Sequence, residues 1–305
     1  MRIRVLGSAA GGGFPQWNCN CANCRGLRAG TLHARARTQS SIALSVDARR
    51  WLLCNASPDI HRQIGQNAGL QPQTGLRDSG IGAILLVDGQ IDHAAGLLLL
   101  REHGAPLPLW TTEPVREDLS TGLPLLKVLH HYCGIAWHRI PVDGTAFSIP
   151  VLPDVSITAL PVAGKPGPYS PYRESPRIGD NVGLVFREQA TGRQLFYAPG
   201  LADITPPVAA AMHDSDCVLV DGTFWSEEEM IRVGVSHKRA RDLGHLPQSG
   251  AGGMIEQLAK LPAACRRILI HINNTNPILD ESGPERAQLL AAGIEVAHDG
   301  MEIEL

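Results

Sequence analysis

The chain has 305 residues, a formal net charge of −3 at pH 7 and 44% hydrophobic residues. This length suffices for one large α/β domain or two small ones, and the composition is that of an ordinary globular protein. The slight negative charge provides no overall attraction to nucleic acid, and the apolar runs are too short to span a bilayer. Because the start of the chain lacks the apolar core of a signal peptide, we expect a cytoplasmic protein without nucleic-acid or membrane partners.

Apolar runs separated by Gly and Pro predict a chain rich in strands with short helices between them. The predicted strands cover residues 2–6, 40–46, 51–54, 81–87, 107–110, 137–140, 155–160, 182–186, 194–198, 217–220, 267–271, 294–297 and 302–305. The predicted helices cover residues 59–67, 94–103, 114–119, 124–132, 206–212, 250–260 and 287–292. The continuously apolar strand at 81–87 is typical of a strand buried on both faces.

The order of these elements predicts the fold class. Antiparallel strand pairs followed by a helix occur once in each half of the chain, and no linker separates two cores. This arrangement favours one α/β domain over residues 1–305, with two mixed sheets packed face to face and helices outside. Side chains able to bind ligands repeatedly follow the carboxyl ends of strands, where α/β sheets commonly place their sites.

Three cysteines near the N-terminus form a candidate metal site. Cys19, Cys21 and Cys24 supply three thiolates within six residues, and Zn²⁺ prefers soft sulfur ligands. The alternative is a chance cluster of cysteines in a loop. Because no helix is predicted around them, we expect a structural zinc loop at about residues 14–26, closed by a fourth ligand from elsewhere.

A second candidate metal site combines residues that follow different strands. Asp92 and His93 are adjacent after strand 81–87, while Asp221 and His271 lie at the ends of two later strands. Two imidazoles with carboxylates and open positions are the ligand set of non-haem Fe(II) centres. Individually, an Asp after a strand is more often a turn former or a helix cap. The occurrence of all four residues after strands predicts a cleft that holds a divalent metal.

Three further features have two interpretations each. His245 is a proton donor or a packed core histidine. The glycine-rich segment 7–13 could cradle a phosphate, but it lacks the Gly-Lys-Ser/Thr ending, which favours a backbone turn. The basic segment 237–241 is a solvated loop or a site for an anionic ligand.

The long Pro/Gly-rich segment 161–180 is of the kind that is usually functional or mobile.

Four segments resemble one known family. Residues 6–21, 87–96, 220–225 and 271–277 closely resemble the pyrroloquinoline quinone (PQQ) biosynthesis protein B family of the metallo-β-lactamase superfamily, and the similarity runs essentially end to end. The resemblance implies an αββα sandwich, a cysteine-bound structural zinc and a role in making the quinone cofactor. Related phosphodiesterases place a histidine three residues beyond the residue equivalent to His271, so Asn274 is expected to close the zinc site through its side-chain oxygen.

The superfamily motif His-x-His-x-Asp-His is altered in this chain. Asp88 and Gln90 replace its two leading histidines, and Val162-Ala163-Gly164 replaces a later one. By the same resemblance, Asp92, His93 and His271 match ligands of the second metal, and Asp221 matches the bridging carboxylate. We therefore expect one cleft metal, Fe(II) or another divalent ion. The candidate catalytic residues are Asp88, Gln90 and His245.

The resemblance also implies a reaction. The family is associated with an iron-dependent hydroxylation of the tyrosine ring in a cross-linked Glu–Tyr precursor. A metal-dependent hydrolase, and a carrier that moves PQQ or its precursor towards the periplasm, are the alternatives. Because such a substrate carries several carboxylates, Arg173 or Arg177 is expected to bind it. The alternative is that these arginines lie on a solvated surface loop.

The zinc loop is also a candidate dimer interface. A metal-bound loop presents a fixed surface, and twofold homodimers are the commonest soluble assemblies. Phe14, Pro15 and Trp17 could form the apolar centre of this contact. The competing interpretation is that these side chains cover the edge of the cleft in a monomer.

Overall fold

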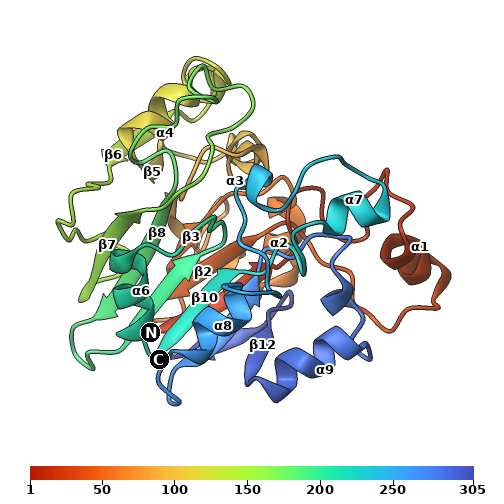
Figure 1. Cartoon of the computed structure of the whole chain (residues 1–305). Helices are drawn as coiled ribbons and strands as arrows, with labels where there is room; N and C mark the ends of the chain where they lie inside the picture. The colour runs from red at the N-terminus through yellow and green to blue at the C-terminus, as the bar shows by residue number, and fades with distance from the viewer.

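The computed structural model describes residues 1–305 and contains two mixed sheets packed face to face (Figure 1). The first sheet, in the order β13-β1-β2-β3-β4-β5-β6, consists of β1 Arg2–Gly7, β2 Ser41–Ser45, β3 Trp51–Cys54, β4 Ile81–Leu85, β5 Leu107–Thr111, β6 Ile135–Arg139 and β13 Glu302–Glu304. The second, in the order β12-β11-β10-β9-β8-β7, consists of β7 Val155–Pro161, β8 Val182–Glu188, β9 Gln194–Ala198, β10 Cys217–Asp221, β11 Arg266–Ile270 and β12 Ile294–Val296.

Each sheet begins with antiparallel strands and continues with parallel ones. The pairs β1–β2, β2–β3, β7–β8 and β8–β9 are antiparallel, whereas β3 to β6 and β9 to β12 run parallel within their sheets. The expected mixed sheets are thus confirmed, and β8 and β9 form an antiparallel hairpin. Parallel strands end at the same edge of a sheet, so their carboxyl-terminal loops gather at one side of the sandwich.

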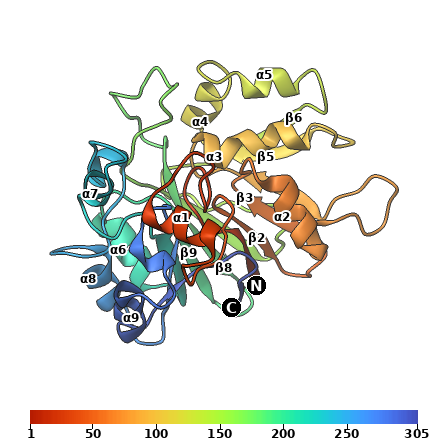
Figure 2. The same cartoon turned by 90° about the vertical axis from the view of Figure 1, so that its right-hand side faces the viewer.

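Helices cover both outer faces, which completes the αββα layers (Figure 2). Beside the first sheet lie α2 Ile60–Gln66, α3 Ile91–Ala94, α4 Glu113–Asp118 and α5 Leu125–Leu129, with the 3₁₀ turns η1 Ala68–Leu70 and η2 Ala95–Leu100. Beside the second lie α6 Pro206–His213, α7 Glu229–Val233, α8 Met254–Ala259 and α9 Pro284–Ala291, with η3 Arg241–Leu243 and η4 Pro277–Leu279. None of the helices is long and apolar enough to cross a membrane.

Three apolar clusters correspond to the three interfaces between layers. The central one joins the sheets through residues such as Val5 of β1 and Phe186 of β8. The outer clusters join α6, α8 and α9 to the second sheet and α2, α4 and α5 to the first. Successive residues of β4 alternate between interfaces, Ala83 and Leu85 facing the second sheet and Ile84 the helices. The prediction of a strand buried on both faces is therefore confirmed.

Two helical predictions are wrong. The single helix expected at 94–103 is a short α3 followed by the 3₁₀ turn η2. Gly96 lies so close to the backbone that an added Cβ would be 2.1 Å from the carbonyl oxygen of Ser57, and its amide donates to Ala56. A helix α1, Ala22–Ala29, also begins within the cysteine cluster, where only a loop was expected. It has eight residues, contains two arginines and a glycine, and buries only Cys24 and Gly26.

A partly buried carboxylate connects the turn between β12 and β13 to the segments that follow β1 and precede β2. One oxygen of Asp299 accepts hydrogen bonds from the amide and hydroxyl of Ser8, and the other accepts them from the amide and hydroxyl of Thr38. The guanidinium of the buried Arg37 donates to the Ser8 hydroxyl. The amino group of Met1 donates to the Leu305 carbonyl nearby, so the chain ends lie side by side (Figure 1).

We predict that Asp299→Asn lowers the free energy of unfolding by about 1–3 kcal/mol. An amide offers only one acceptor oxygen, so one pair of donors in this partly buried site would face the NH₂ group of the new side chain. Urea unfolding of the variant and of an Asp214→Asn control, which changes an exposed carboxyl, measures the effect. Equal stabilities of all three proteins would contradict it.

Candidate metal centre

A cleft of about 330 Å³ opens at the carboxyl ends of β4, β10 and β11. Asp92 and His93 follow β4 in the chain, Asp221 ends β10 and His271 directly follows β11. The segments 163–181 and 238–245 contribute the facing walls. The sheets thus bring together residues that are up to 179 positions apart in the sequence.

Three of the predicted ligands converge on one point. The Oδ2 atom of Asp92 lies 3.4 Å from Nε2 of His271 and 3.8 Å from Nε2 of His93. All three ligand atoms lie within 4.8 Å of one another, a spacing that can hold a metal ion. The Nε2 atom of His93 is buried and has no hydrogen-bond partner. Since a buried polar atom without a partner is costly, these donors fit a bound cation.

Asp88 supports this group from behind. Both of its carboxylate oxygens lie 2.9 Å from Nδ1 of His93, and both side chains are buried. A carboxylate has no hydrogen, so Nδ1 is the donor and Nε2 is left free in the neutral ring. This carboxylate–histidine pair is how proteins usually orient an imidazole ligand. Asp88 was predicted to be catalytic, but its position is that of a residue that orients His93.

The protonation of this group depends on its buried charges. Burial lowers the pKa of His93, but the carboxylates of Asp88 and Asp92 raise it more, to about 9. Burial raises the pKa of Asp92, but His93 and His271 hold it well below its usual range. Burial lowers the pKa of His271. In the metal-free protein, then, the positive charge opposite Asp92 is carried mainly by His93.

A second group shares His271 with the first. Asp221, His245 and His271 also place ligand atoms within 4.8 Å of one another. Thr223 lies between them, its hydroxyl 2.8 Å from Nδ1 of His271 and 2.6 Å from Oδ1 of Asp221. The other oxygen of Asp221 lies 2.7 Å from Nδ1 of His245 and accepts a hydrogen bond from the Leu201 amide.

These contacts give Asp221 and His245 different surroundings from those expected. Both oxygens of Asp221 already accept hydrogen bonds, so it supports the two histidines around it, and its role as a metal ligand stays a prediction. His245 lines the cleft and is not a packed core residue, and its role as a proton donor stays a prediction. Burial lowers the pKa of His245, but the carboxylate of Asp221 raises it by more, so this pKa lies above its ordinary value.

The backbone is strained where His271 enters the cleft. Its φ of 62° is in the left-handed region, which costs a non-glycine residue on the order of 1–3 kcal/mol. The Thr223 hydroxyl lies 2.9 Å from the carbonyl oxygen of His271 as well as beside its ring, which holds this conformation. The glycine-rich segment 7–13 forms a turn against the same site, and a Cβ at Gly11 would lie 3.2 Å from Oδ2 of Asp92.

The long segment between β7 and β8 borders the cleft, as predicted. It is attached to the loop that carries Asp92 at two points. The side-chain amide of Gln90 donates to the Lys165 carbonyl at 3.0 Å, and the hydroxyl of Tyr169 donates to the Gly89 carbonyl. Gln90 was predicted to be catalytic, and in the structure its amide nitrogen connects these two loops. A movement of the segment between β7 and β8 would therefore also displace the loop that precedes Asp92 and His93.

Cationic side chains at the cleft differ in part from those predicted. Arg173 lines the cleft together with Lys165 and Lys238. Arg177 does not, because its guanidinium is bound to acidic side chains and lies 3.7 Å over the ring of Tyr172. Those acidic residues are Glu117, Asp118 and Asp180. The prediction that Arg177 meets a ligand is therefore corrected. Lys238 belongs to the basic segment 237–241 that the sequence analysis left between two interpretations.

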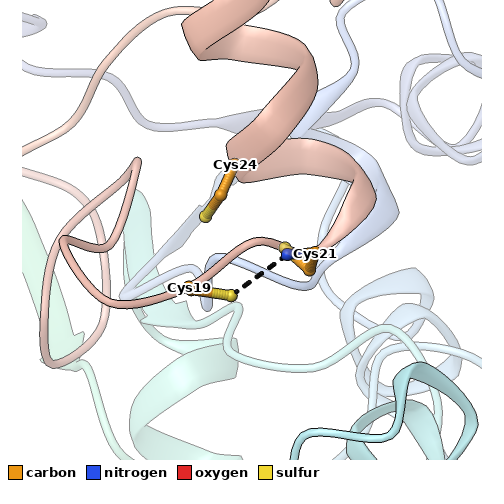
Figure 3. Close-up of side chains that lie close together, drawn as sticks. All are labelled: Cys19, Cys21 and Cys24. Carbon is orange, nitrogen blue, oxygen red and sulfur yellow. Dashed lines mark hydrogen bonds between the residues drawn. The ribbon is translucent and has the colours of Figure 1, made fainter.

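The three N-terminal cysteines lie close together on a loop and the start of α1 (Figure 3). Cys21 precedes α1 and Cys24 lies in its first turn, so the site is partly helical and not confined to a loop. The sulfur atoms of Cys19, Cys21 and Cys24 lie within 4.8 Å of one another. This grouping fits a closed tetrahedral zinc site that lacks one ligand.

Asn274 lies over these sulfurs, but with the opposite orientation from that predicted. Its Nδ2 atom, and not its oxygen, lies 3.0 Å from Sγ of Cys19 and 3.3 Å from Sγ of Cys24. An amide nitrogen with two hydrogens is no metal ligand, so closing the site through Oδ1 requires the amide to turn over. The expectation that Phe14 contributes to a dimer contact is wrong, because Phe14 is buried in the core and only Trp17, 85% exposed, offers a large apolar surface there. The homodimer itself stays a prediction.

Comparison with known proteins places the chain in a family. The Beta-lactamase superfamily domain matches residues 50–272. Coenzyme PQQ synthesis protein B of Azoarcus sp. is 59% identical over the whole of both chains, and the protein of that name from Cupriavidus necator is 58% identical over 99% of each. The chain belongs to the coenzyme PQQ synthesis protein B family.

Solved structures agree with this membership. A crystal structure of Zn²⁺-bound PqqB from Methylobacterium extorquens superposes on the chain with a TM-score of 0.89, at 40% identity over 100% of both chains. A diphosphatase of the PhnP family matches with a TM-score of 0.68 at 21% identity, covering 100% of this chain and 98% of its own. This second likeness shows the shared metallo-β-lactamase fold.

We predict that Asp88→Asn weakens metal binding in the cleft by about 10- to 100-fold. An asparagine can present its NH₂ group to Nδ1 of His93, which favours the tautomer with a hydrogen on Nε2. Competition with a chromogenic chelator measures the affinity, and Asp78→Asn in an exposed loop is the control. An affinity equal to that of the control would show that Asp88 does not orient a ligand.

We also predict that filling the cleft at about pH 7.5 releases at least one proton per metal. With a pKa of about 9, His93 is protonated in the metal-free protein, and it must be neutral to bind. Metal affinity should therefore fall as the pH drops below about 9, by up to about tenfold per unit for this proton. Calorimetry in two buffers of different ionisation enthalpy, with the cysteine site already filled, counts the protons, and a count of zero would contradict the prediction.

Proposed function

We propose that the protein acts in PQQ synthesis as an iron-dependent hydroxylase of the tyrosine ring in a cross-linked Glu–Tyr precursor. The role in PQQ synthesis is supported by the names of full-length relatives. The observation that supports metal chemistry is the buried Nε2 atom of His93, which has no partner and lies beside Asp92 and His271. The hydroxylation itself is the reaction that the family resemblance implies.

The donor set suits this proposal. One carboxylate and two imidazoles, from Asp92, His93 and His271, with other positions open, form the arrangement found in non-haem Fe(II) oxygenases. When bound, iron would supply the oxygen chemistry that no side chain in this cleft can perform. The same donors also accept Zn²⁺, the metal named for the relative from Methylobacterium extorquens. The chain's own part is to orient His93 through Asp88 and to place a ring beside these ligands.

A hydrolase with two metals is less well supported. Asp88 and Gln90 stand at the positions of the two leading histidines, and both are used for internal hydrogen bonds. Asp221, which would bridge two metals, has both oxygens occupied. A second metal would therefore have to displace several of these contacts. A carrier remains distinguishable from both enzymes, because it would release its ligand unchanged.

The cationic side chains of the cleft could hold the carboxylates of such a substrate. The ammonium group of Lys165 lies 3.2 Å from the carboxylate of the exposed Glu174. An exposed ion pair of this kind contributes little to the stability of the protein. Arg239 and Arg241 pair with Glu228 and Glu227, whereas Lys238, just before them in the chain, forms no ion pair. Arg173 and Lys238 therefore offer charge to the cleft from different segments.

Anaerobic reconstitution with Fe²⁺, followed by substrate and O₂, tests the proposal by mass spectrometry. A gain of oxygen atoms in the product would support the hydroxylase. Cleavage of the substrate would instead identify a hydrolase, and an unchanged bound ligand would identify a carrier. Protein loaded with Zn²⁺ in place of Fe²⁺ is the control, because zinc has no redox chemistry.

We predict that Lys238→Gln and Arg173→Gln each weaken substrate binding by about 10-fold or more, as expected for the loss of a hydrogen bond to a charged group. The turnover number should change less, because neither side chain lies among the metal ligands. Arg239→Gln, in the same loop but paired with Glu228, is the matched control. Substrate affinities equal to that of the control would remove both residues from the binding site.

A further inference from the structure

Asn273 occupies a position in the cleft wall that the proposed reaction has not used. It lies two residues beyond His271 and lines the cleft. Its Nδ2 atom donates to the hydroxyl of Thr275 at 2.6 Å and lies 3.4 Å from the sulfur of Met230. Both hydrogens of the amide are thus engaged within the protein, whereas no protein group donates to its Oδ1 atom.

The orientation of this amide is set by a chain of hydrogen bonds that starts at a buried carboxylate. One oxygen of Glu229 accepts the hydroxyl hydrogen of Thr275 at 2.5 Å, and the other accepts the Trp225 amide at 2.6 Å. Thr275 has a single hydroxyl hydrogen, which this bond uses, so its oxygen can only accept from Asn273. Side-chain amides are oriented by such networks, and this one turns NH₂ inward.

We propose that Asn273 is a substrate-positioning residue, whose Oδ1 atom accepts a hydrogen bond from an N–H or O–H group of the molecule bound beside the metal ligands. Glu229 and Thr275 maintain the amide in this orientation without touching the bound molecule. The proposal deepens the proposed function and rests on it for the choice of probe, because an amino acid with a phenol ring carries both kinds of donor.

The arrangement complements the other groups of the cleft. Arg173, Lys165 and Lys238 all present positive charge, which suits the carboxylates of a ligand but repels an ammonium group. Asn273, two residues beyond His271, adds a neutral acceptor to the same pocket lining. The lining can therefore hold the acid and the donor group of one ligand through different residues.

The test measures the binding of three probes to Zn²⁺-loaded protein by calorimetry, so that no turnover takes place. The probes are L-tyrosine, O-methyl-L-tyrosine, which lacks the phenol donor, and 3-(4-hydroxyphenyl)propanoate, which lacks the ammonium donor. Burial raises the pKa of Glu229 to about 7, so measurements near pH 8 keep it ionised. We expect the wild type to prefer L-tyrosine to one of the analogues by about three- to tenfold. The weaker analogue identifies the donor.

Variants of Thr275 separate positioning from a merely structural role. Thr275→Val removes the hydroxyl at nearly constant shape and should abolish the preference, because the amide of Asn273 is then free to turn. Thr275→Ser keeps the hydroxyl and should preserve the preference, as the matched control. Asn273→Ala should abolish it too, without affecting the affinity for the analogue that lacks the donor.

Glu229→Gln provides a sharper test, because it reverses the direction of the hydrogen bonds from residue 229 through Thr275 to Asn273. With its oxygen facing the Trp225 amide, the new side chain would donate to Thr275, whose hydroxyl would then donate to Asn273. The amide would turn its NH₂ group to the cleft, and the preference for the donor-bearing probe should disappear. A preference retained in both Thr275→Val and Glu229→Gln would overturn the proposal, as would equal or absent binding of all three probes to the wild type. Failure of the hydroxylation assay alone would leave these binding ratios unaffected.

Discussion

The arrangement of the cleft ligands depends on the buried pair formed by Asp88 and His93. A charged carboxylate is costly to bury unless it is paired and hydrogen-bonded, and Nδ1 of His93 lies 2.9 Å from both of its oxygens. The same contact leaves Nε2 of His93 without a partner at the point where Asp92 and His271 meet. One interaction therefore explains both why the superfamily's leading histidine can be replaced by aspartate and why three donors remain free for a cation.

The rest of the sandwich places partners around this pair. Parallel strands in both sheets end at the cleft, and Thr223 holds His271 in its strained conformation while bridging towards Asp221 and His245. Connections between the ligand loop and the segment 162–181 pass through Gln90 and Tyr169. The cysteine cluster adjoins the segment after β11 through Asn274, three residues beyond His271. Both candidate metal sites thus depend on the segment that follows β11.

The sequence predicted the layers of the fold and most strands, because alternating and continuous apolar runs record burial directly. It brought together Asp92, His93 and His271 through their places after strands, but it misjudged residues whose role depends on contacts. From the sequence, Arg177 was a candidate for ligand binding, but in the structure its guanidinium is paired with Asp118 and Asp180. Helix α1 was missed because it is short, mostly polar and buries only two residues, and the break at Gly96 was missed because it follows from a close approach of the backbone. The hydrogen bonds that connect Glu229 through Thr275 to Asn273 have no local signal in the sequence.

X-ray absorption and anomalous scattering from crystals of the protein loaded with Fe²⁺ and Zn²⁺ provide the most direct measurement. We expect a single metal ion in the cleft, bound through Nε2 of His93 and His271 and through the carboxylate of Asp92, with Asp88 still hydrogen-bonded to Nδ1 of His93. We also expect a separate ion at Cys19, Cys21 and Cys24. Two cleft metals bridged by Asp221, or a cleft metal bound to Asp88 in place of His93, would contradict the expected arrangement in the cleft.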